Sequence, residues 1–347
     1  MEGYNKKVIM NYWTICRMKT TKKIYVKVSI IFLLGGILLF SSCEKEENQK
    51  IEANRKTLFM YLPWSSNLTN YFYNNISDLE KCITKIGLNN EKVIVFISTG
   101  STEAMMFEIV SSHGRCKREI LKKYKSPPFT TIDGITAILN DVKAFAPASV
   151  YTMIIGCHGM GWLPVYEMKV RSAPHMKMHW EYQGVPLTRY FGGLTAEYQT
   201  DIKSLASGIA NAGMKMEYIL FDDCYMSSIE VAYELKDVTK YLIGSTSEMM
   251  AYGMPYAAIG EYLLGNPDYQ SGCEEFYNFY STYEIMPCGT LAVTDCSELE
   301  NMAAIIKSIN SKYSFDKSLR GTIQRLDGYT PVIFYDFADY ITSLCND

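Results

Sequence analysis

A histidine and a cysteine, each following an apolar run, are the residues of this sequence best placed to do chemistry. His158 comes after the run Val150–Gly156, and Cys224 comes after Glu217–Phe221. Short continuous runs of Val, Ile and aromatic residues are typical of buried parallel strands. Because open parallel sheets place reactive groups at the carboxyl ends of their strands, we expect both side chains at one edge of a sheet. An imidazole there can take the proton of a thiol and prepare it for nucleophilic attack.

Taken singly, either residue has a plainer explanation. A lone cysteine is usually an inert member of the core, and a lone histidine after a strand is usually structural. Here the two residues occur together at matching strand ends, and Gly159 and Gly161 flank the histidine. This combination favours a functional site. Glycine lets a substrate backbone approach closely and lets backbone N–H groups point at a ligand.

Two phrases resemble the clostripain family of cysteine peptidases. Residues 157–164 read CHGMGWLP and residues 219–235 read ILFDDCYMSSIEVAYEL. The phrase IGSTSEMMAYGMPY at residues 243–256 is similar to the segment that follows the nucleophile strand in bacterial members. The resemblance runs from about Thr57 to the end of the chain. It implies the α/β fold of that clan, a caspase-like three-layer α/β/α sandwich with a mostly parallel central sheet.

The resemblance also implies roles for the motif residues. Cys224 is expected to be the nucleophile and His158 the general base, with an oxyanion hole formed by the backbone N–H groups of Gly159 and Cys224. Protein or peptide substrates are expected, and no cofactor is required. Calcium is possible, but no motif indicates a site for it. No acid is evident near the histidine, so the sequence favours a Cys–His dyad.

Cys157 is a second candidate thiol, at a position where the family pattern suggests a small residue such as serine. Successive side chains on a strand point to opposite faces, so Cys157 and its neighbour His158 should not reach each other. We therefore expect Cys157 to pack beneath the edge of the sheet.

Asp222 lies two residues before Cys224, where the arginine- and lysine-cleaving members of the family carry a specificity aspartate. Residues two apart on a strand end face the same side, so the carboxylate and the thiol can line one cleft. A carboxylate there would pair with a basic side chain, which implies cleavage after Arg or Lys. Asp222 could instead cap a turn, and Asp223 or Glu248 could bind the substrate in its place.

Strand and helix signals alternate through residues 57–347, which predicts one peptidase domain built from crossover units. The run His113–Lys125 is expected to be a basic loop, and Trp162–Gly193 a surface excursion. Self-cleavage is expected in one of these two loops, at Arg115, Lys117 or Arg118 in the first or at Lys169 or Arg171 in the second. Val332–Asp336 is expected to be a last strand, and a truncated C-terminus is an open alternative.

The first 42 residues are expected to be removed as an upstream segment and a lipoprotein signal peptide. The apolar stretch Val28–Phe40 is short for a membrane span. Its end overlaps with Leu39–Cys43, which reads as a bacterial lipobox. Cleavage before Cys43 would leave its thiol for a lipid anchor, with residues 43–56 as a polar tether. This predicts an outer membrane lipoprotein on the periplasmic or cell-surface face. A short transmembrane anchor is the alternative.

The charge of the chain narrows the choice of partners. Of 34 basic and 37 acidic residues, seven and one lie in residues 1–42, so the remainder carries 27 and 36 and a net charge of −9. So acidic a protein is a poor candidate for nucleic acid and is compatible with basic substrates. The ten cysteines show no CxxC spacing, which indicates neither a zinc knuckle nor a disulfide framework.

Three classes of function remain open from the sequence. The leading one is a lipid-anchored cysteine endopeptidase, and the second is a catalytically inactive surface binding lipoprotein on a peptidase fold. The third is another thiol acyltransferase or a carbohydrate-processing enzyme, suggested by the 27 tyrosines. Glycosidases need two carboxylates flanking a cleft, and Asp222 and Asp223 are too close in sequence for that role.

Overall fold

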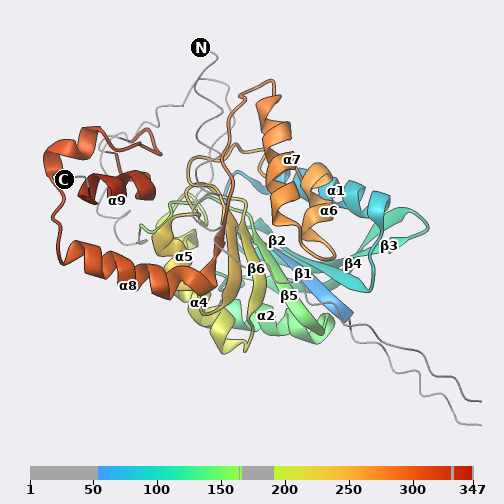
Figure 1. The fold of residues 1–347 in the computed structure, drawn as a ribbon. Coiled ribbons are helices and arrows are strands. Elements are labelled where there is room, and N and C mark those ends of the chain that lie inside the picture. The colour runs from blue at the N-terminus through green and yellow to red at the C-terminus, as the bar shows by residue number, and fades with distance from the viewer. Residues whose placement is uncertain (1–53, 164, 166–190, 330–331, 346–347) are drawn as a thin grey trace, which may run out of the picture. The chain divides into compact units, whose positions relative to one another are not determined.

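A single mixed sheet runs through the part of the chain that the structure describes (Figure 1). The structure is a computed structural model that describes residues 54–163, 165, 191–329 and 332–345. Within these residues the strand order is β4-β3-β2-β1-β5-β6-β7-β8. The strands are β1 Asn54–Leu62, β2 Glu91–Gly100, β3 Glu103–Ser112, β4 Arg115–Lys125, β5 Ala148–Ile155, β6 Met216–Phe221, β7 Thr239–Gly244 and β8 Ala292–Asp295.

The five central strands are parallel and the outer ones antiparallel. β1 pairs in parallel with both β2 and β5, and β5, β6 and β7 continue the parallel run. β3, β4 and β8 are antiparallel to their neighbours. The predicted mostly parallel sheet is therefore confirmed. Since the chain leaves β1 first towards β2 and later places β5 on the other side, the loops after β1 and β5 diverge, as at the ligand sites of open α/β sheets.

Helices cover both faces of the sheet and complete three layers (Figure 1). α1, α6 and α7 pack on one face, and α2, α4 and α5 on the other. The described helices are α1 Thr69–Ile86, α2 Ile132–Phe145, α4 Ile202–Asn211, α5 Ile229–Leu235, α6 Tyr256–Leu263, α7 Tyr269–Ser281, α8 Leu299–Asn310 and α9 Phe337–Cys345. The expected caspase-like α/β/α sandwich is thus confirmed.

Apolar patterning explains these layers. In β6 Leu220 belongs to the core under α1, α6 and α7, and its neighbour Phe221 to the core on the opposite face. Both faces are covered, so the strand reads as a continuous apolar run. In α1 the buried residues Phe72, Ile76 and Ile83 recur at helical spacing and form one apolar stripe.

The segment expected to be a basic loop is instead the edge strand β4. It forms an antiparallel hairpin with β3 through His113 and Gly114, whose φ angles of 51° and 68° suit a tight two-residue turn. Its many lysines and arginines interrupt the apolar pattern by which a strand is predicted. Such charges are typical of edge strands, where they discourage pairing with other chains. Arg115, Lys117 and Arg118 therefore lie in a strand, where a protease would have to open the sheet edge to cut.

The prediction of a last strand at Val332–Asp336 is also wrong. Within its described part, only an isolated bridge joins Tyr335 to Arg325. The segment is organised by Asp327, whose carboxylate accepts hydrogen bonds from the backbone N–H groups of Tyr329, Ile333 and Phe334. One carboxylate satisfies these donors locally, so the segment does not need a strand partner.

Several expectations fall outside the described residues. These are the signal peptide, Cys43 with most of its tether, and nearly all of the excursion after Trp162, including Lys169 and Arg171. The chain divides into Met1–Lys50 and Ile51–Asp347, and the described residues belong to the second unit. None of its described helices is long and apolar enough to span a membrane.

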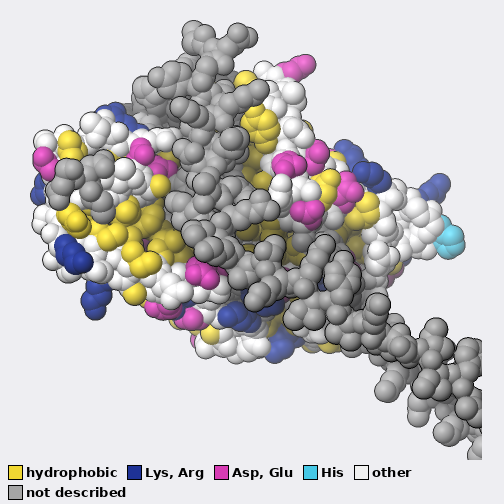
Figure 2. All heavy atoms as spheres, in the orientation of Figure 1, with side chains coloured by type: hydrophobic (Ala, Val, Ile, Leu, Met, Phe, Trp, Pro, Cys, Tyr) yellow, Lys and Arg dark blue, Asp and Glu magenta, His cyan; other side chains and the backbone are white. Residues whose placement is uncertain are grey.

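α8 is largely exposed. It buries only Leu299 among its residues, and Ile305 is 59% exposed. Figure 2 shows apolar side chains, in yellow, gathered on the visible face around this part of the molecule. α8 therefore contributes little to the core that positions the strand ends.

Candidate active site

Loops after four neighbouring parallel strands meet at one edge of the sheet. They carry Asn67 after β1, His158 after β5, Cys224 after β6 and Met249 after β7. Hydrogen bonds join Asn67 to His158 and Met249 to Cys224. The predicted placement of His158 and Cys224 at neighbouring strand ends is therefore observed.

Cys224 is fully buried, and its sulfur contacts the backbone of the loop after β7. The Met249 N–H donates to Sγ over 3.2 Å, and the Met249 carbonyl lies 3.6 Å from the same atom. A backbone donor aimed at sulfur stabilises the thiolate relative to the thiol. The Met249 carbonyl is placed to accept the proton while the thiol is protonated. Cys224 is thus held by one residue in either protonation state.

His158 is also fully buried and is oriented by two contacts. Its Nε2 lies 2.7 Å from Asn67 Oδ1, and its backbone N–H donates to the Gly192 carbonyl over 3.1 Å. An amide oxygen only accepts, so this contact favours the tautomer in which Nε2 carries the ring hydrogen and Nδ1 is the basic nitrogen. Asn67 is a residue that the sequence interpretation missed, since nothing in its type or spacing marks it as a partner of His158.

Glycine is required where the two motif loops touch. A Cβ atom at Gly159 would lie 2.4 Å from the Cys224 carbonyl oxygen and 2.9 Å from Asp223 Cβ. Gly161 has a φ of 57°, and a Cβ there would lie 2.8 Å from the Tyr225 carbonyl oxygen. Backbone therefore packs directly on backbone, which brings the loop of His158 against the loop of Cys224.

Tyr225, directly after Cys224, adopts a backbone conformation that bulky residues rarely take. Its φ is 59°. Its N–H donates to the Ser247 carbonyl over 2.9 Å, and its ring stacks on Phe334 at 4.4 Å with an interplanar angle of 3°. Burial, and after it the Glu248 carboxylate, raise the pKa of the Tyr225 hydroxyl. The loop of Cys224 is held in a strained form by its neighbours, which is common at functional sites.

Asp222 is buried behind Cys224 and holds the chain before α6. Its Oδ1 accepts from the Met254 N–H over 2.8 Å, and its Oδ2 accepts from the Tyr256 hydroxyl over 3.0 Å. This is the turn-holding role that the sequence left open.

Cys157 is buried, as expected, and lies on the other face of the sheet from Cys224. Cys157 belongs to the core beneath α2, α4 and α5, whereas Cys224 belongs to the core beneath α1, α6 and α7. Its backbone N–H and its thiol both contact the carboxylate of Asp223. The second candidate thiol is therefore directed away from the nucleophile.

The described side chains include neither a disulfide nor a metal cluster. No disulfide is formed by the described cysteines, which are Cys82, Cys116, Cys157, Cys224, Cys273, Cys288 and Cys296. Among the described side chains, no group of three or more His, Cys, Asp or Glu residues is placed to hold a metal ion.

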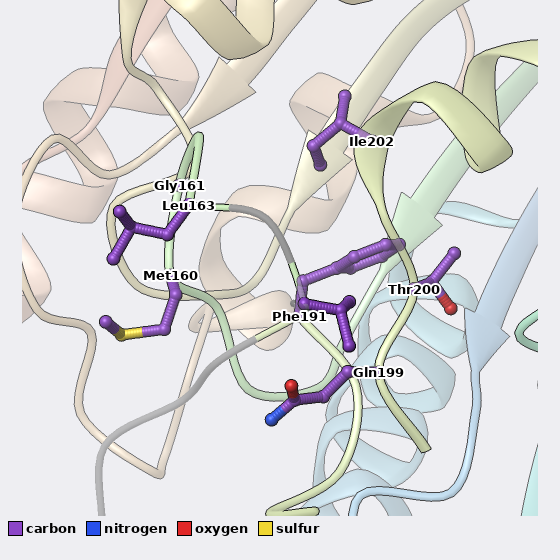
Figure 3. Close-up of a pocket in the computed structure, with 8 residues that line it drawn as sticks. Met160, Gly161, Leu163, Phe191, Gln199, Thr200 and Ile202 are labelled. Carbon is purple, nitrogen blue, oxygen red and sulfur yellow. The ribbon is translucent and has the colours of Figure 1, made fainter. Parts of the chain in front are cut away.

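A small pocket of about 30 Å³ adjoins the loop of His158 (Figure 3). Met160, Gly161 and Leu163 form one side, and Phe191 and Ile202 the other, while Gln199 and Thr200 add polar groups. It is a mainly apolar hollow next to the loop that carries the base.

The chain matches the model of the Clostripain family over residues 60–344. Among solved structures, it is similar to a secreted C11 cysteine protease from Bacteroides thetaiotaomicron, "iotapain". The two share 60% identity over 85% of this chain and 81% of that chain, with a TM-score of 0.78. No curated protein matches the chain.

Two more distant structures share the fold. One is an inactive zymogen C11 protease from Parabacteroides distasonis, with 24% identity, coverage of 84% and 78%, and a TM-score of 0.69. The other is a secreted C11 cysteine protease from Bacteroides thetaiotaomicron in complex with an irreversible peptide inhibitor, with 20% identity, the same coverages and a TM-score of 0.66. The match across most of the chain, joined to the histidine and cysteine at neighbouring strand ends, shows that this chain belongs to the clostripain family of cysteine peptidases.

Proposed function

We propose that this chain is a cysteine endopeptidase in which Cys224 is the nucleophile and His158 the proton-transfer residue. The single observation that carries the proposal is the contact between the two motif loops, where Gly159 lies against the backbone of Cys224. The contact of the two loops supports a thiol and an imidazole from neighbouring strand ends acting together, as covalent catalysis requires. The 60% identical secreted C11 protease supports the same reaction class.

The reaction follows from these groups. The Cys224 thiolate attacks the carbonyl carbon of the scissile peptide, and the backbone N–H groups of Gly159 and Cys224 stabilise the oxyanion. His158 gives its proton to the leaving amine as the C–N bond breaks, which leaves a thioester. Water then attacks the thioester, with His158 accepting its proton, and releases the acid and the thiol. No metal or other cofactor is needed for these steps.

Asn67 supports the dyad without taking part in proton transfer. Its Oδ1 fixes the Nε2–H of His158, so Nδ1 remains the atom that exchanges the proton. The same hydrogen bond stabilises the imidazolium that forms when Cys224 is ionised. The proposed machinery is therefore a Cys–His dyad with an amide that sets the tautomer.

We propose that the enzyme is made in a latent form. The support is the burial of Cys224 and His158, both of which are fully buried. Burial of this kind favours the second candidate, an inactive binding lipoprotein, unless the site opens. Self-cleavage at a basic residue is the opening step that we propose, with Lys169 and Arg171 as the candidates, since Arg115, Lys117 and Arg118 lie in β4.

We further propose that the enzyme cleaves after Arg or Lys. Asp222 lies two residues before Cys224 and is a buried carboxylate that already binds Met254 and Tyr256, which supports it as the first candidate. Glu248 is the second candidate, because it precedes the residue that binds Cys224 and is 9% exposed. A carboxylate at either position would pair with an ammonium or guanidinium group of the substrate.

The test is a panel of fluorogenic peptides that differ only at the residue before the scissile bond. The wild-type enzyme should prefer Arg and Lys, and Cys224→Ala and His158→Ala should reduce turnover to background. Asp222→Asn and Glu248→Gln separate the two carboxylates, because only the specificity residue should lower kcat/KM for basic substrates much more than for neutral ones. Equal cleavage after small or apolar residues would contradict the basic preference.

A thiol-directed peptide probe separates the enzyme from the inactive binder. Once the proposed self-cleavage has taken place, a peptide with an acyloxymethyl ketone group should label the wild type and leave Cys224→Ala unlabelled. Failure of the probe and of every peptide in the panel would support the binding lipoprotein instead.

The cellular location that we propose is the outer membrane, with the protein held by a lipid at Cys43. The support is the lipobox-like sequence before Cys43 and the secreted nature of the 60% identical relative. Mass spectrometry of membrane-extracted protein should find a lipidated Cys43 at the amino terminus. A longer mature chain with an unmodified Cys43 would contradict the anchor.

A further inference from the structure

Asp223 joins the two catalytic loops from the side opposite to Cys224. It lies between the proposed specificity residue and the nucleophile and is fully buried. Its Oδ1 accepts from the backbone N–H of Cys157 over 2.6 Å, and its Oδ2 lies 3.5 Å from the Cys157 sulfur. Cys157 and Asp223 each directly precede a proposed catalytic residue, since His158 follows Cys157 and Cys224 follows Asp223.

The two contacts differ in strength. A carboxylate that accepts a backbone N–H at 2.6 Å makes a short, charge-assisted hydrogen bond, the stronger class in proteins. The thiol is a weak donor, and 3.5 Å is a long contact for it. The backbone bond therefore dominates, and it does not depend on the side chain of Cys157.

The contact is reinforced by the packing around it. Gly159 lies against Asp223 Cβ and the Cys224 carbonyl with no room for a side chain. A shift of either loop would break the hydrogen bond inside the core or force these backbones together. Because an unsatisfied buried carboxylate is costly, the bond resists such a shift.

We propose that Asp223 is a positioning residue that fixes the loop of His158 relative to Cys224, acting through the backbone N–H of Cys157. The inference rests on the proposed dyad of His158 and Cys224. It assigns the Asp223 side chain to geometry, so its charge serves the hydrogen bond and is not itself required for the reaction.

Two simpler roles for Asp223 predict different effects on the pKa of Cys224. A negative charge beside a thiol disfavours the thiolate, so a purely electrostatic Asp223 raises the pKa of Cys224, and its removal by either Ala or Asn should lower that pKa. A residue important only for folding should leave the pKa unchanged. If Asp223 is a positioning residue, the pKa of Cys224 should rise, and it should rise in the Ala variant only. Asp223→Ala separates the thiolate from the imidazolium and raises the pKa of Cys224, while Asp223→Asn keeps an acceptor for Cys157 N–H.

The experiment measures the rate of Cys224 alkylation by iodoacetamide against pH, with the modified cysteine identified by peptide mass mapping. For Asp223→Ala the midpoint should move up towards that of His158→Ala, by about one pH unit, which corresponds to a tenfold loss of thiolate. For Asp223→Asn it should stay at or below the wild-type value. Asp141→Ala, which removes an acid that contacts Tyr124 away from the site, is the matched control and should not move the midpoint.

Peptide hydrolysis gives a second readout. Asp223→Ala should lower kcat at least tenfold with KM within a factor of about two, Asp223→Asn should recover most of kcat, and Cys157→Ala should stay close to wild type. Unchanged kcat and midpoint in Asp223→Ala, or an equal loss in Asp223→Asn, would overturn the proposal.

The proposal stays testable even if the peptidase function fails. If the wild type hydrolyses no peptide, the alkylation midpoint still reports the coupling of Cys224 to His158. If alkylation does not reach Cys224, a crystal structure of Asp223→Ala decides. Displaced loops around Cys157 and His158 would support positioning, and unchanged atoms would overturn it.

Discussion

The loops after β5 and β6 each place a buried cysteine at a strand end, yet the two thiols lie on opposite faces of the sheet. Cys224 meets the backbone N–H of Met249 on the face of α1, α6 and α7. Cys157 meets the carboxylate of Asp223 on the face of α2, α4 and α5. A donor N–H favours a thiolate, whereas a neighbouring carboxylate disfavours it. Two cysteines at neighbouring strand ends therefore lie in different environments, and the face of the sheet decides which environment each has.

The largest expected effect distinguishes these two thiols directly. Cys224→Ala removes the nucleophile and should lower kcat/KM by roughly 10³-fold or more, whereas Cys157→Ala should stay within a few-fold of wild type. Steady-state hydrolysis of a basic fluorogenic peptide gives the measurement. The comparison between the two loops would be reversed if Cys157→Ala were the inactive variant.

The second effect concerns the partner of the base. Asn67→Ala leaves His158 in place but removes the acceptor that fixes its tautomer, and should lower kcat about 10- to 100-fold, within the range that general acid–base catalysis contributes. Asn67→Asp keeps an acceptor and should retain more activity than Ala. Asn75→Ala, at a buried asparagine that donates to the Tyr252 carbonyl, is the control. Equal activity of Asn67→Ala and wild type would remove Asn67 from the site.

The third effect tests the support behind the nucleophile loop. Phe334 is buried and stacks on Tyr225, so Phe334→Ala should lower the free energy of unfolding by about 3 kcal/mol and also lower kcat, since Tyr225 loses the contact that holds its strained backbone. Phe315→Ala, at a partly exposed ring that contacts Tyr340, should cost less stability and leave kcat unchanged. Chemical denaturation and peptide hydrolysis measure the two quantities. A fall in stability with an unchanged kcat would show that the stack is structural only.

The smallest effect concerns thiols that are merely buried. Burial raises the pKa of Cys82, Cys273 and Cys296 to about 11, so each is protonated at pH 8 and is about one thousandth thiolate. Iodoacetamide at pH 8 should leave these three unmodified, and their labelling should rise only as the pH approaches 11. Peptide mass mapping across this range checks the expectation. Rapid labelling of all three at pH 8 would mean that burial does not suppress these thiols.

Local patterns were enough to predict much of the fold. The apolar runs at 150–156 and 217–221 are observed as β5, Ala148–Ile155, and β6, Met216–Phe221, because a strand covered on both faces must be apolar throughout. β4 was missed because an edge strand exposes charged side chains and loses that signal. The segment at 332–336 was misassigned because Asp327, and not a neighbouring strand, satisfies its backbone.

The sequence by itself determined the chemical types and their order along the chain: a histidine and a cysteine after strands, glycines beside the histidine and acids before the cysteine. Tertiary structure alone decided the pairings. Asn67 meets His158 across 91 positions, and Cys157 meets Asp223 across 66. Such pairs carry no local periodicity, because their contact is set by the strand order and register of the folded sheet. The face on which each thiol lies is fixed in the same way, by how the loops leave their strands.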